Sequence, residues 1–177
     1  MKQTHEIDGW FNYQKTFDFL IDLLPNDGIF VECGAWMGKS SSYLCDKIYE
    51  LKPNAKIYIV DTWLGTDTDI TGQLASNSDV YSLFLDNMGD RKFTTIKQTS
   101  KLAAQQFKDK SLDIIFIDMG HSYDEVKQDL LYWRPKLKDS GIIAGHDWFF
   151  PGVSSAVKEC FKDIKLSDGD CWIVLSS

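Results

Sequence analysis

Short apolar runs alternate with amphipathic segments along most of the chain. The segments that have the pattern of buried strands are 28–34, 57–61, 93–97, 112–118 and 142–147. The segments with apolar residues at helical spacing are 17–24, 40–51, 79–87, 101–107, 123–133 and 154–161. Strands that alternate with helices predict right-handed crossovers and a largely parallel sheet, covered by helices on both faces.

The end of the chain departs from this alternation. Residues 164–166 and 171–175 read as two strands around the turn residues Ser167-Asp168-Gly169-Asp170, which predicts a closing hairpin. The stretch 65–77 is rich in Thr, Asp and Gly, and we expect a mobile loop there. Because no repeat or linker interrupts the pattern, we expect a single domain over residues 1–177.

Composition narrows the class of protein. The chain is 44% hydrophobic and 25% charged, as ordinary globular proteins are, so neither disorder nor a coiled coil is expected. A net charge of −7 argues against a nucleic-acid binder and against adsorption to anionic membranes. The first ten residues contain no apolar signal core, and the four cysteines form no C-x-x-C pair. We therefore expect a cytoplasmic protein with buried free thiols.

The ends of the predicted strands carry the candidate chemistry. Open parallel sheets bind ligands at the carboxyl ends of their strands. The first strand runs into Glu32-x-Gly34-x-x-x-Gly38-x-Ser40 and then directly into a helix. Glycines allow a ligand to approach the backbone closely, and a helix N-terminus offers free N–H donors. Asp61 ends the second strand, where an acidic residue commonly binds a ribose diol.

Two further strands also end in acidic residues. Asp118 closes the strand 112–118, and His146-Asp147 closes the strand 142–147. Carboxylates are costly to bury unless they are paired or bind a ligand. Acidic residues at several strand ends of one sheet edge therefore predict a functional cleft there.

These residues resemble the class I S-adenosylmethionine (SAM)-dependent methyltransferases, and more narrowly the macrocin O-methyltransferase group. Residues 32–40 look like the first motif of that class. Asp61-Thr62-Trp63 resembles the group's D-x-W, residues 118–129 its D-x-x-H-x-Y-x-x-V-x-x-D, and Gly145-His146-Asp147 its G-H-D. The resemblance extends from about residue 10 to the end of the chain. It implies an α/β fold: a Rossmann-like three-layer sandwich with a seven-stranded, mostly parallel sheet and an antiparallel last strand.

The resemblance also implies SAM as the cofactor. The residues that it assigns to cofactor binding are Glu32, Gly34, Gly38, Ser40, Asp61, Trp63, Ser100 and Asp118. Asp61 is expected to hold the ribose hydroxyls. Trp63 has two readings, either packing against the adenine or ribose or forming an aromatic plug over the sheet edge. Trp10 and Phe11 resemble a segment that covers the cofactor pocket.

Methyl transfer to a hydroxyl requires the acceptor to be positioned and deprotonated. His121, three residues after Asp118, matches the candidate base of related enzymes, so we expect His121 and Asp118 to be catalytic; His121 could instead only hydrogen-bond Asp118 or its loop. Asp118, Asp147 and His146 could hold Mg²⁺ or another divalent metal. Metal-dependent relatives have an acidic pair where this chain has His146-Asp147. Histidine suits Mn²⁺, Fe or Zn better than Mg²⁺, so a metal requirement stays open.

Two other functions compete with this interpretation. Tyr123-x-x-x-Lys127 matches the catalytic pair of NAD(P)-dependent short-chain oxidoreductases, although in that family the tyrosine follows the fifth strand and the chain is longer. A non-catalytic cofactor-binding domain is the other alternative. For a methyltransferase, the resemblance favours a small-molecule hydroxyl acceptor, such as a sugar or a small natural product. No nucleic-acid or membrane partner is expected, and a homo-oligomer is left open.

Overall fold

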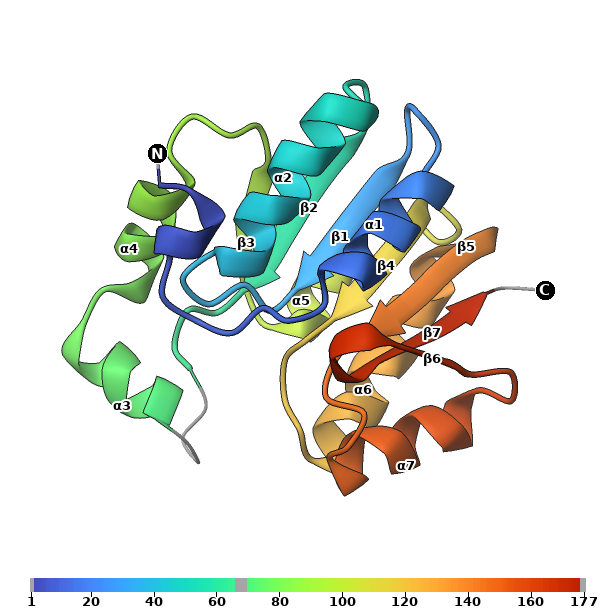
Figure 1. The fold of residues 1–177 in the computed structure, drawn as a ribbon. Helices are drawn as coiled ribbons and strands as arrows, with labels where there is room; N and C mark the ends of the chain where they lie inside the picture. Colours follow the sequence, from blue (N-terminus) through green and yellow to red (C-terminus); the bar gives the residue numbers. More distant parts are fainter. Residues whose placement is uncertain (1, 66–69, 176–177) are drawn as a thin grey trace.

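The computed structural model describes residues 2–65 and 70–175, and a central sheet organises this part of the chain (Figure 1). The sheet has seven strands in the order β3-β2-β1-β4-β5-β7-β6. The strands are β1 (Ile29–Cys33), β2 (Lys56–Asp61), β3 (Thr94–Lys97), β4 (Leu112–Ile117), β5 (Leu137–Gly145), β6 (Lys165–Ser167) and β7 (Cys171–Leu175). Strand order reverses between β1 and β4, which is where such sheets bind ligands.

Strand direction confirms the expected Rossmann-like sandwich. Strands β3, β2, β1, β4 and β5 pair in parallel, whereas β7 runs antiparallel to both β5 and β6. The predicted closing hairpin is therefore β6 and β7, joined by a short 3-10 turn at Asp168–Asp170.

Helices cover both faces of the sheet (Figure 1). They are α1 (Gln14–Leu23), α2 (Lys39–Leu51), α3 (Ile70–Asn77), α4 (Val80–Met88), α5 (Ser100–Ala104), α6 (Tyr123–Trp133) and α7 (Pro151–Cys160). Consecutive strand residues face opposite sides, so Phe30 joins the core under α1, α2 and α4, while Val31 joins the core under α5, α6 and α7. The central strands are buried on both sides, which explains their continuous apolar runs.

Two sequence-based expectations are wrong in detail. The stretch 65–77 is not all loop, because Ile70–Asn77 forms α3; residues 66–69 of that expectation lie outside the described residues. The partly buried Ala75 packs α3 against the core, a contact that composition alone does not reveal. Strand β5 begins at Leu137, earlier than predicted, because Leu112 of β4 pairs with Leu137 before the register shifts.

None of the described helices is long and apolar enough to cross a lipid bilayer. All four cysteines are free thiols, and three of them are buried. The packing therefore agrees with the expected buried thiols.

Candidate active site

A cavity of about 1070 Å³ opens at the carboxyl ends of the parallel strands. The N-terminal segment 8–12 and the start of α6 contribute to its walls. The sequence-predicted site residues that line the cavity are Gly34, Ser40, Asp61, Ser100, Asp118, His121, His146 and Asp147. Ligand pockets commonly span roughly 300–1,000 Å³, so this cavity has room for a cofactor and an acceptor together.

Two glycines shape the loop that follows β1. Gly34 has a φ of +93°, and a Cβ on it would lie 1.7 Å from the carbonyl oxygen of Asp118. Only glycine therefore lets the loop after β1 pass against the loop after β4. Gly38 has a φ of +92° where α2 begins, and it does not line the cavity. Its role is to turn the chain into the helix.

Asp61 holds this loop over the strand ends. Its Oδ2 accepts hydrogen bonds from the backbone N–H groups of Ala35 (2.8 Å) and Trp36 (2.9 Å). Its Oδ1 accepts one from the backbone N–H of Trp63 (2.7 Å). Asp61 therefore organises the loop, and the residue also lines the cavity.

Glu32 lies beneath the cavity rather than in its wall. Its carboxyl oxygens accept hydrogen bonds from the hydroxyls of Ser40 (2.6 Å) and Ser41 (2.5 Å), and the residue is fully buried. Burial raises the pKa of Glu32 to about 7, although the two serine hydroxyls lower it. Glu32 therefore connects β1 to the first turn of α2, and Ser40 makes the contact with the cavity.

Trp63 takes the position of an aromatic plug. It is buried and does not line the cavity. Its indole N–H donates to the carbonyl of Trp36 (2.9 Å), and its ring lies 4.6 Å from Tyr81 and 4.9 Å from Phe84, measured between centroids. Of the two sequence readings, the geometry favours packing over direct contact with a cofactor.

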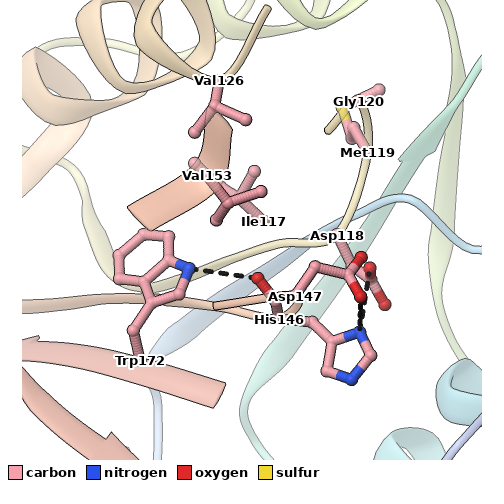
Figure 2. A pocket seen from close by; sticks show the side chains of 9 residues that line it. All are labelled: Ile117, Asp118, Met119, Gly120, Val126, His146, Asp147, Val153 and Trp172. Atoms are coloured by element: carbon pink, nitrogen blue, oxygen red, sulfur yellow. Dashed lines mark hydrogen bonds and ion pairs between the residues drawn. The ribbon is translucent and has the colours of Figure 1, made fainter. Parts of the chain in front are cut away.

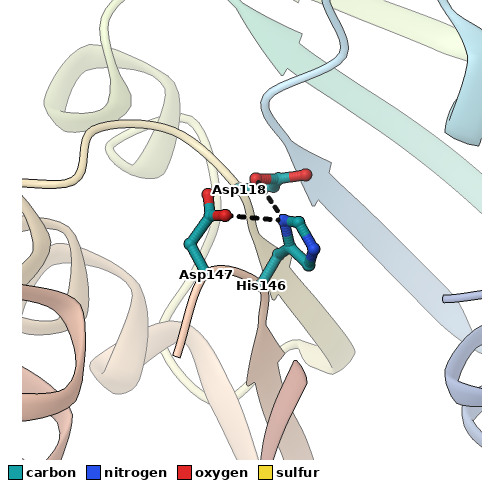
Figure 3. A group of neighbouring side chains, drawn as sticks. All are labelled: Asp118, His146 and Asp147. Atoms are coloured by element: carbon teal, nitrogen blue, oxygen red, sulfur yellow. Dashed lines mark ion pairs between the residues drawn. The ribbon is translucent and has the colours of Figure 1, made fainter. Parts of the chain in front are cut away.

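Asp118, His146 and Asp147 form a compact cluster at the ends of β4 and β5 (Figure 3). The Nδ1 atom of His146 lies 3.1 Å from Asp147 Oδ1 and 3.5 Å from Asp118 Oδ1. Burial lowers the pKa of His146, but hydrogen bonds to Asp118 and Asp147 outweigh it and raise the pKa to about 10. These hydrogen bonds therefore favour the imidazolium form of His146.

Asp147 also reaches His121. Its Oδ2 lies 2.7 Å from His121 Nε2, and the His121 ring stacks on Phe150 at 4.6 Å with an interplanar angle of 16°. Burial raises the pKa of Asp147, but hydrogen bonds to His121 and His146 outweigh it and hold the pKa well below its usual range. Asp147 is thus an ionised carboxylate between two imidazoles. Its φ of 62° is unusual for a residue other than glycine, and such strain concentrates at functional sites.

Contacts from the closing hairpin hold the loop after β5. The indole N–H of Trp172 donates to the carbonyl oxygen of His146 (3.2 Å; Figure 2). The Asp170 carboxylate accepts from the backbone N–H of Phe149 (3.0 Å), and its carbonyl accepts from Trp148 N–H (3.0 Å). The small cavity drawn in Figure 2 is only about 10 Å³, room for roughly one water. The antiparallel hairpin therefore helps to fix His146 and Asp147.

The cluster fits a divalent metal ion. Asp118, His146 and Asp147 each offer one ligand atom, and these atoms lie within 4.8 Å of one another. Two carboxylate oxygens and one imidazole nitrogen suit Mn²⁺, Fe²⁺ or Zn²⁺ better than Mg²⁺, which prefers oxygen ligands. Nδ1 of His146 faces the two carboxylates, whereas its Nε2 is buried and has no hydrogen-bond partner among the described residues.

Comparison with known proteins identifies the family. A family model described as a methyltransferase domain matches residues 31–148, well over half of the chain. The chain belongs to this family of methyltransferase domains. SAM dependence follows from the family.

Solved structures share the fold of this methyltransferase at low sequence identity. The O-methyltransferase NovP is 15% identical, with a TM-score of 0.69, over 93% of this chain and 79% of NovP. The calicheamicin methyltransferase CalS11 is 16% identical, with a TM-score of 0.64, over 92% of this chain and 77% of CalS11. The Streptococcus mutans protein SMU.1697c, solved in complex with SAH (S-adenosylhomocysteine), is 12% identical, with a TM-score of 0.61. The match covers 100% of this chain and 99% of SMU.1697c.

One protein of Sinorhizobium fredii, y4gI, is related in sequence. It is 26% identical over 123 residues, which are 66% of this methyltransferase but only 13% of y4gI. The chain therefore spans a small part of that relative's length.

The pair that suggested an oxidoreductase lies outside the cavity of the methyltransferase. Lys127 Nζ donates to the Tyr123 hydroxyl (3.0 Å) and lies 2.9 Å from Glu159 Oε1, and the Tyr123 hydroxyl also bonds Glu159. Neither Tyr123 nor Lys127 lines the cavity. These residues connect α6 to α7 on the surface, which is a structural role.

Sequence reasoning missed a wall of the cavity on α6. Asp124, Gln128 and Tyr132 all line it, and the Tyr132 hydroxyl donates to Gln128 Oε1 (2.9 Å). Their spacing of four residues places them on one helix face, and this polar stripe was the available signal.

Proposed function

We propose that this methyltransferase transfers the methyl group of SAM to a hydroxyl of a small acceptor, a sugar or a small natural product. One observation carries the proposal: the His121–Asp147 pair lies in the cavity wall beside Asp118 and His146. A histidine paired with a carboxylate is suited to take a proton from a hydroxyl. The O-methyltransferase NovP and the calicheamicin methyltransferase CalS11, which share the fold, support a small acceptor.

His121 serves as the general base in this proposal. Its Nε2 lies 2.7 Å from Asp147 Oδ2, and in this pair the imidazole is the group that takes the proton of the acceptor hydroxyl. Asp147 then stabilises the imidazolium, as the aspartate of a catalytic triad does. Phe150 stacks on the imidazole and holds its plane toward the cavity.

We further propose that Gly34, Ser40, Asp61, Ser100 and Asp118 bind the cofactor, because all of them line the cavity. SAM supplies the electrophilic methyl group when it is bound. Glu32, Gly38 and Trp63, which the sequence also assigned to the cofactor, would support the binding loop from beneath. Asp61 presents its carboxylate where a ribose diol can donate to it.

Asp118, His146 and Asp147 would hold a divalent ion in the same proposal. Such an ion lowers the pKa of a bound hydroxyl and so assists its deprotonation. The role of the protein is to keep the three ligand atoms together, and the hydrogen-bonded loop after β5 does so.

The first experiment combines binding and turnover. S-adenosylhomocysteine (SAH) and NAD are titrated calorimetrically, and methyl transfer is then screened over sugar and phenol acceptors with Mn²⁺, Mg²⁺ or EDTA. We expect binding of SAH, no binding of NAD, and turnover of a hydroxyl acceptor. Methylation only of amine or thiol acceptors would refute O-methyl transfer, and full turnover in EDTA would refute the metal.

Replacement of the base tests the mechanism directly. We expect His121→Ala to abolish turnover while SAH affinity stays within about twofold, because the base contributes roughly 10²–10⁴-fold to rate and does not hold the cofactor. His5→Ala, at an exposed histidine of the N-terminal segment, is the matched control and should leave turnover unchanged. Unimpaired turnover of the His121 variant would place the base elsewhere.

A further inference from the structure

Tyr13 is buried against the candidate metal ligands, although it lies far from them in sequence. Its side chain is 1% exposed, and its hydroxyl donates to Asp118 Oδ2 at 2.8 Å. Its ring lies 4.6 Å from the His146 ring and stacks on Phe116 at 5.2 Å. A buried tyrosine hydroxyl requires a partner, and here that partner is the carboxylate at the centre of the site.

The hydrogen bond decides which oxygen of Asp118 faces the cluster. Oδ2 is engaged by Tyr13, so Oδ1 is left 3.5 Å from His146 Nδ1. With one oxygen tethered, the carboxylate loses its freedom to rotate away from the other ligand atoms. Loss of a partner that orients a metal ligand in this way typically lowers metal affinity by about 10–100-fold.

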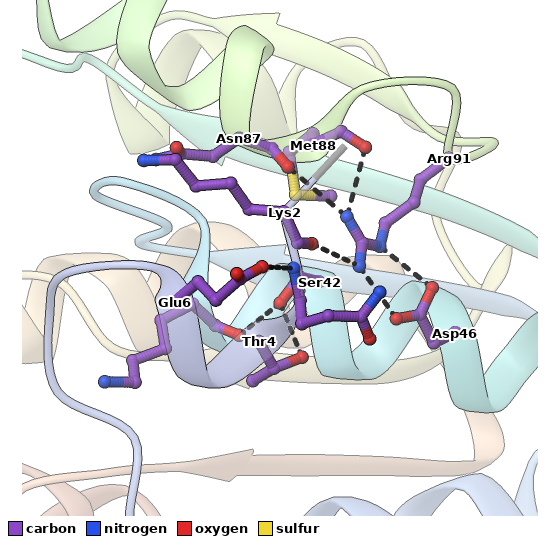
Figure 4. A network of polar contacts seen from close by, with 10 residues as sticks. Lys2, Thr4, Glu6, Ser42, Asp46, Asn87, Met88 and Arg91 are labelled. Carbon is purple, nitrogen blue, oxygen red and sulfur yellow. Dashed lines mark hydrogen bonds and ion pairs between the residues drawn. The ribbon is translucent and has the colours of Figure 1, made fainter.

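Tyr13 also ends the N-terminal segment that forms one wall of the cavity. The other end of this segment is anchored outside the cavity wall, where the Arg91 guanidinium donates to the carbonyl of Lys2 (3.0 Å) and to Asp46 (2.8 Å; Figure 4). Thr4 and Ser42 add a hydroxyl–hydroxyl contact of 2.9 Å. Between these anchors, residues 8–12 line the cavity. The wall is therefore continuous with the residue that holds Asp118.

We propose that Tyr13 is a positioning residue of this methyltransferase: its hydroxyl holds Asp118 for the divalent ion and ties the N-terminal wall of the cavity to the reacting centre. The proposal rests on the ion included in the proposed function. Tyr13 need not touch the acceptor or the cofactor, because it acts through Asp118.

The test compares two tyrosines that make the same kind of hydrogen bond. Tyr13→Phe keeps the ring and removes the hydroxyl, and Tyr43→Phe does the same where Tyr43 donates to Asp18 (2.8 Å), outside the cavity wall. Mn²⁺ affinity is measured from the electron paramagnetic resonance signal of free Mn²⁺, and SAH affinity by calorimetry. We expect Y13F to weaken Mn²⁺ binding by about 10–100-fold and to weaken SAH binding much less, because Asp118 is one of several proposed cofactor contacts, and we expect Y43F to change neither.

The possible results distinguish a failure of the role of Tyr13 from a failure of the proposed methyltransferase function. Equal Mn²⁺ affinity in Y13F and Y43F would overturn the role of Tyr13. Wild-type protein that binds SAH but no Mn²⁺ would overturn both the ion and the role of Tyr13, while the methyltransferase activity stands. Wild-type protein that binds neither would overturn the proposed function itself.

A second measurement needs no substitution and covers a Y13F variant that fails to fold. In wild-type protein labelled with ¹³C-tyrosine, Zn²⁺ should shift the ring resonance of Tyr13 and leave that of Tyr43 in place. Equal shifts at the two tyrosines, or no shift at either, would overturn the role of Tyr13 toward an ion.

Discussion

Glu32 lies near the end of β1 and Asp61 ends the neighbouring β2, yet their surroundings give them different roles. Glu32 is fully buried and accepts from serine hydroxyls, so its pKa is raised to about 7. Asp61 accepts from backbone N–H groups and keeps its carboxylate in the cavity wall. Sequence reasoning treated both as cofactor ligands. Burial separates them, because an unpaired buried charge is costly and favours the neutral acid.

Glu32 should make the stability of the protein depend on pH. The folded pKa is raised from 4.5 to about 7, so the neutral acid stabilises the fold fully below about pH 4.5, and this contribution is lost as pH rises through 7. Glu32→Gln removes this dependence. We expect the free energy of unfolding of E32Q, relative to wild type, to rise by about 2–3 kcal/mol between pH 5 and pH 8, measured by urea denaturation.

The control for this experiment is Glu50→Gln, at an exposed position of α2. The difference in free energy of unfolding between E50Q and wild type should be the same at pH 5 and pH 8. If E32Q behaves like E50Q, Glu32 is already ionised in the folded protein at pH 5.

Helix α6 links local sequence to the position of the proposed base. Ser122 caps the helix by accepting from the backbone N–H of Glu125, and the Glu125 side chain returns a hydrogen bond to Ser122 N–H. This capping box fixes where α6 begins, and His121 immediately precedes the capping residue Ser122. The wall of Asp124, Gln128 and Tyr132 then follows from the same helix face.

Removal of this cap should destabilise the protein measurably. We expect Ser122→Ala to lower the free energy of unfolding by about 1 kcal/mol, because a backbone N–H of the first turn loses its acceptor. Chemical denaturation checks the value. Ser155→Ala, at an exposed interior position of α7, should be neutral or slightly stabilising, since alanine favours helices. Equal changes in the free energy of unfolding for the two variants would show that the Ser122 cap does not stabilise the protein.

At the scale of the whole molecule, the cavity draws its walls from most of the fold. The loops after β1, β2, β4 and β5, the N-terminal segment and α6 all contribute. No single element forms the site, so a ligand that fills the cavity should stabilise the whole folded chain rather than one segment.

SAH should therefore raise the unfolding temperature. At a concentration of 100 times its Kd, a ligand that binds only the folded state adds about 2.7 kcal/mol. For a chain of this size we expect a shift of about 5–10 °C, measured by calorimetry or circular dichroism. NAD at the same concentration is the control and should produce no shift. An unchanged unfolding temperature with SAH would argue against cofactor binding in the cavity.

Local patterns in the sequence predicted most of the elements, their order along the chain and an α/β fold with a largely parallel sheet. Apolar runs marked the buried strands, and turn residues marked the hairpin of β6 and β7. The acidic residues at strand ends also predicted the edge where the cavity opens. These signals are local, because side-chain period and turn chemistry act over a few neighbouring residues.

Tertiary structure alone decided which side chains meet. It placed Glu32 and Trp63 beneath the cavity wall and turned Tyr123 and Lys127 away toward Glu159. It also brought the hydroxyl of Tyr13 to Asp118, 105 positions along the chain. Such contacts depend on how distant elements pack around both faces of the sheet, and no short stretch of sequence carries that information.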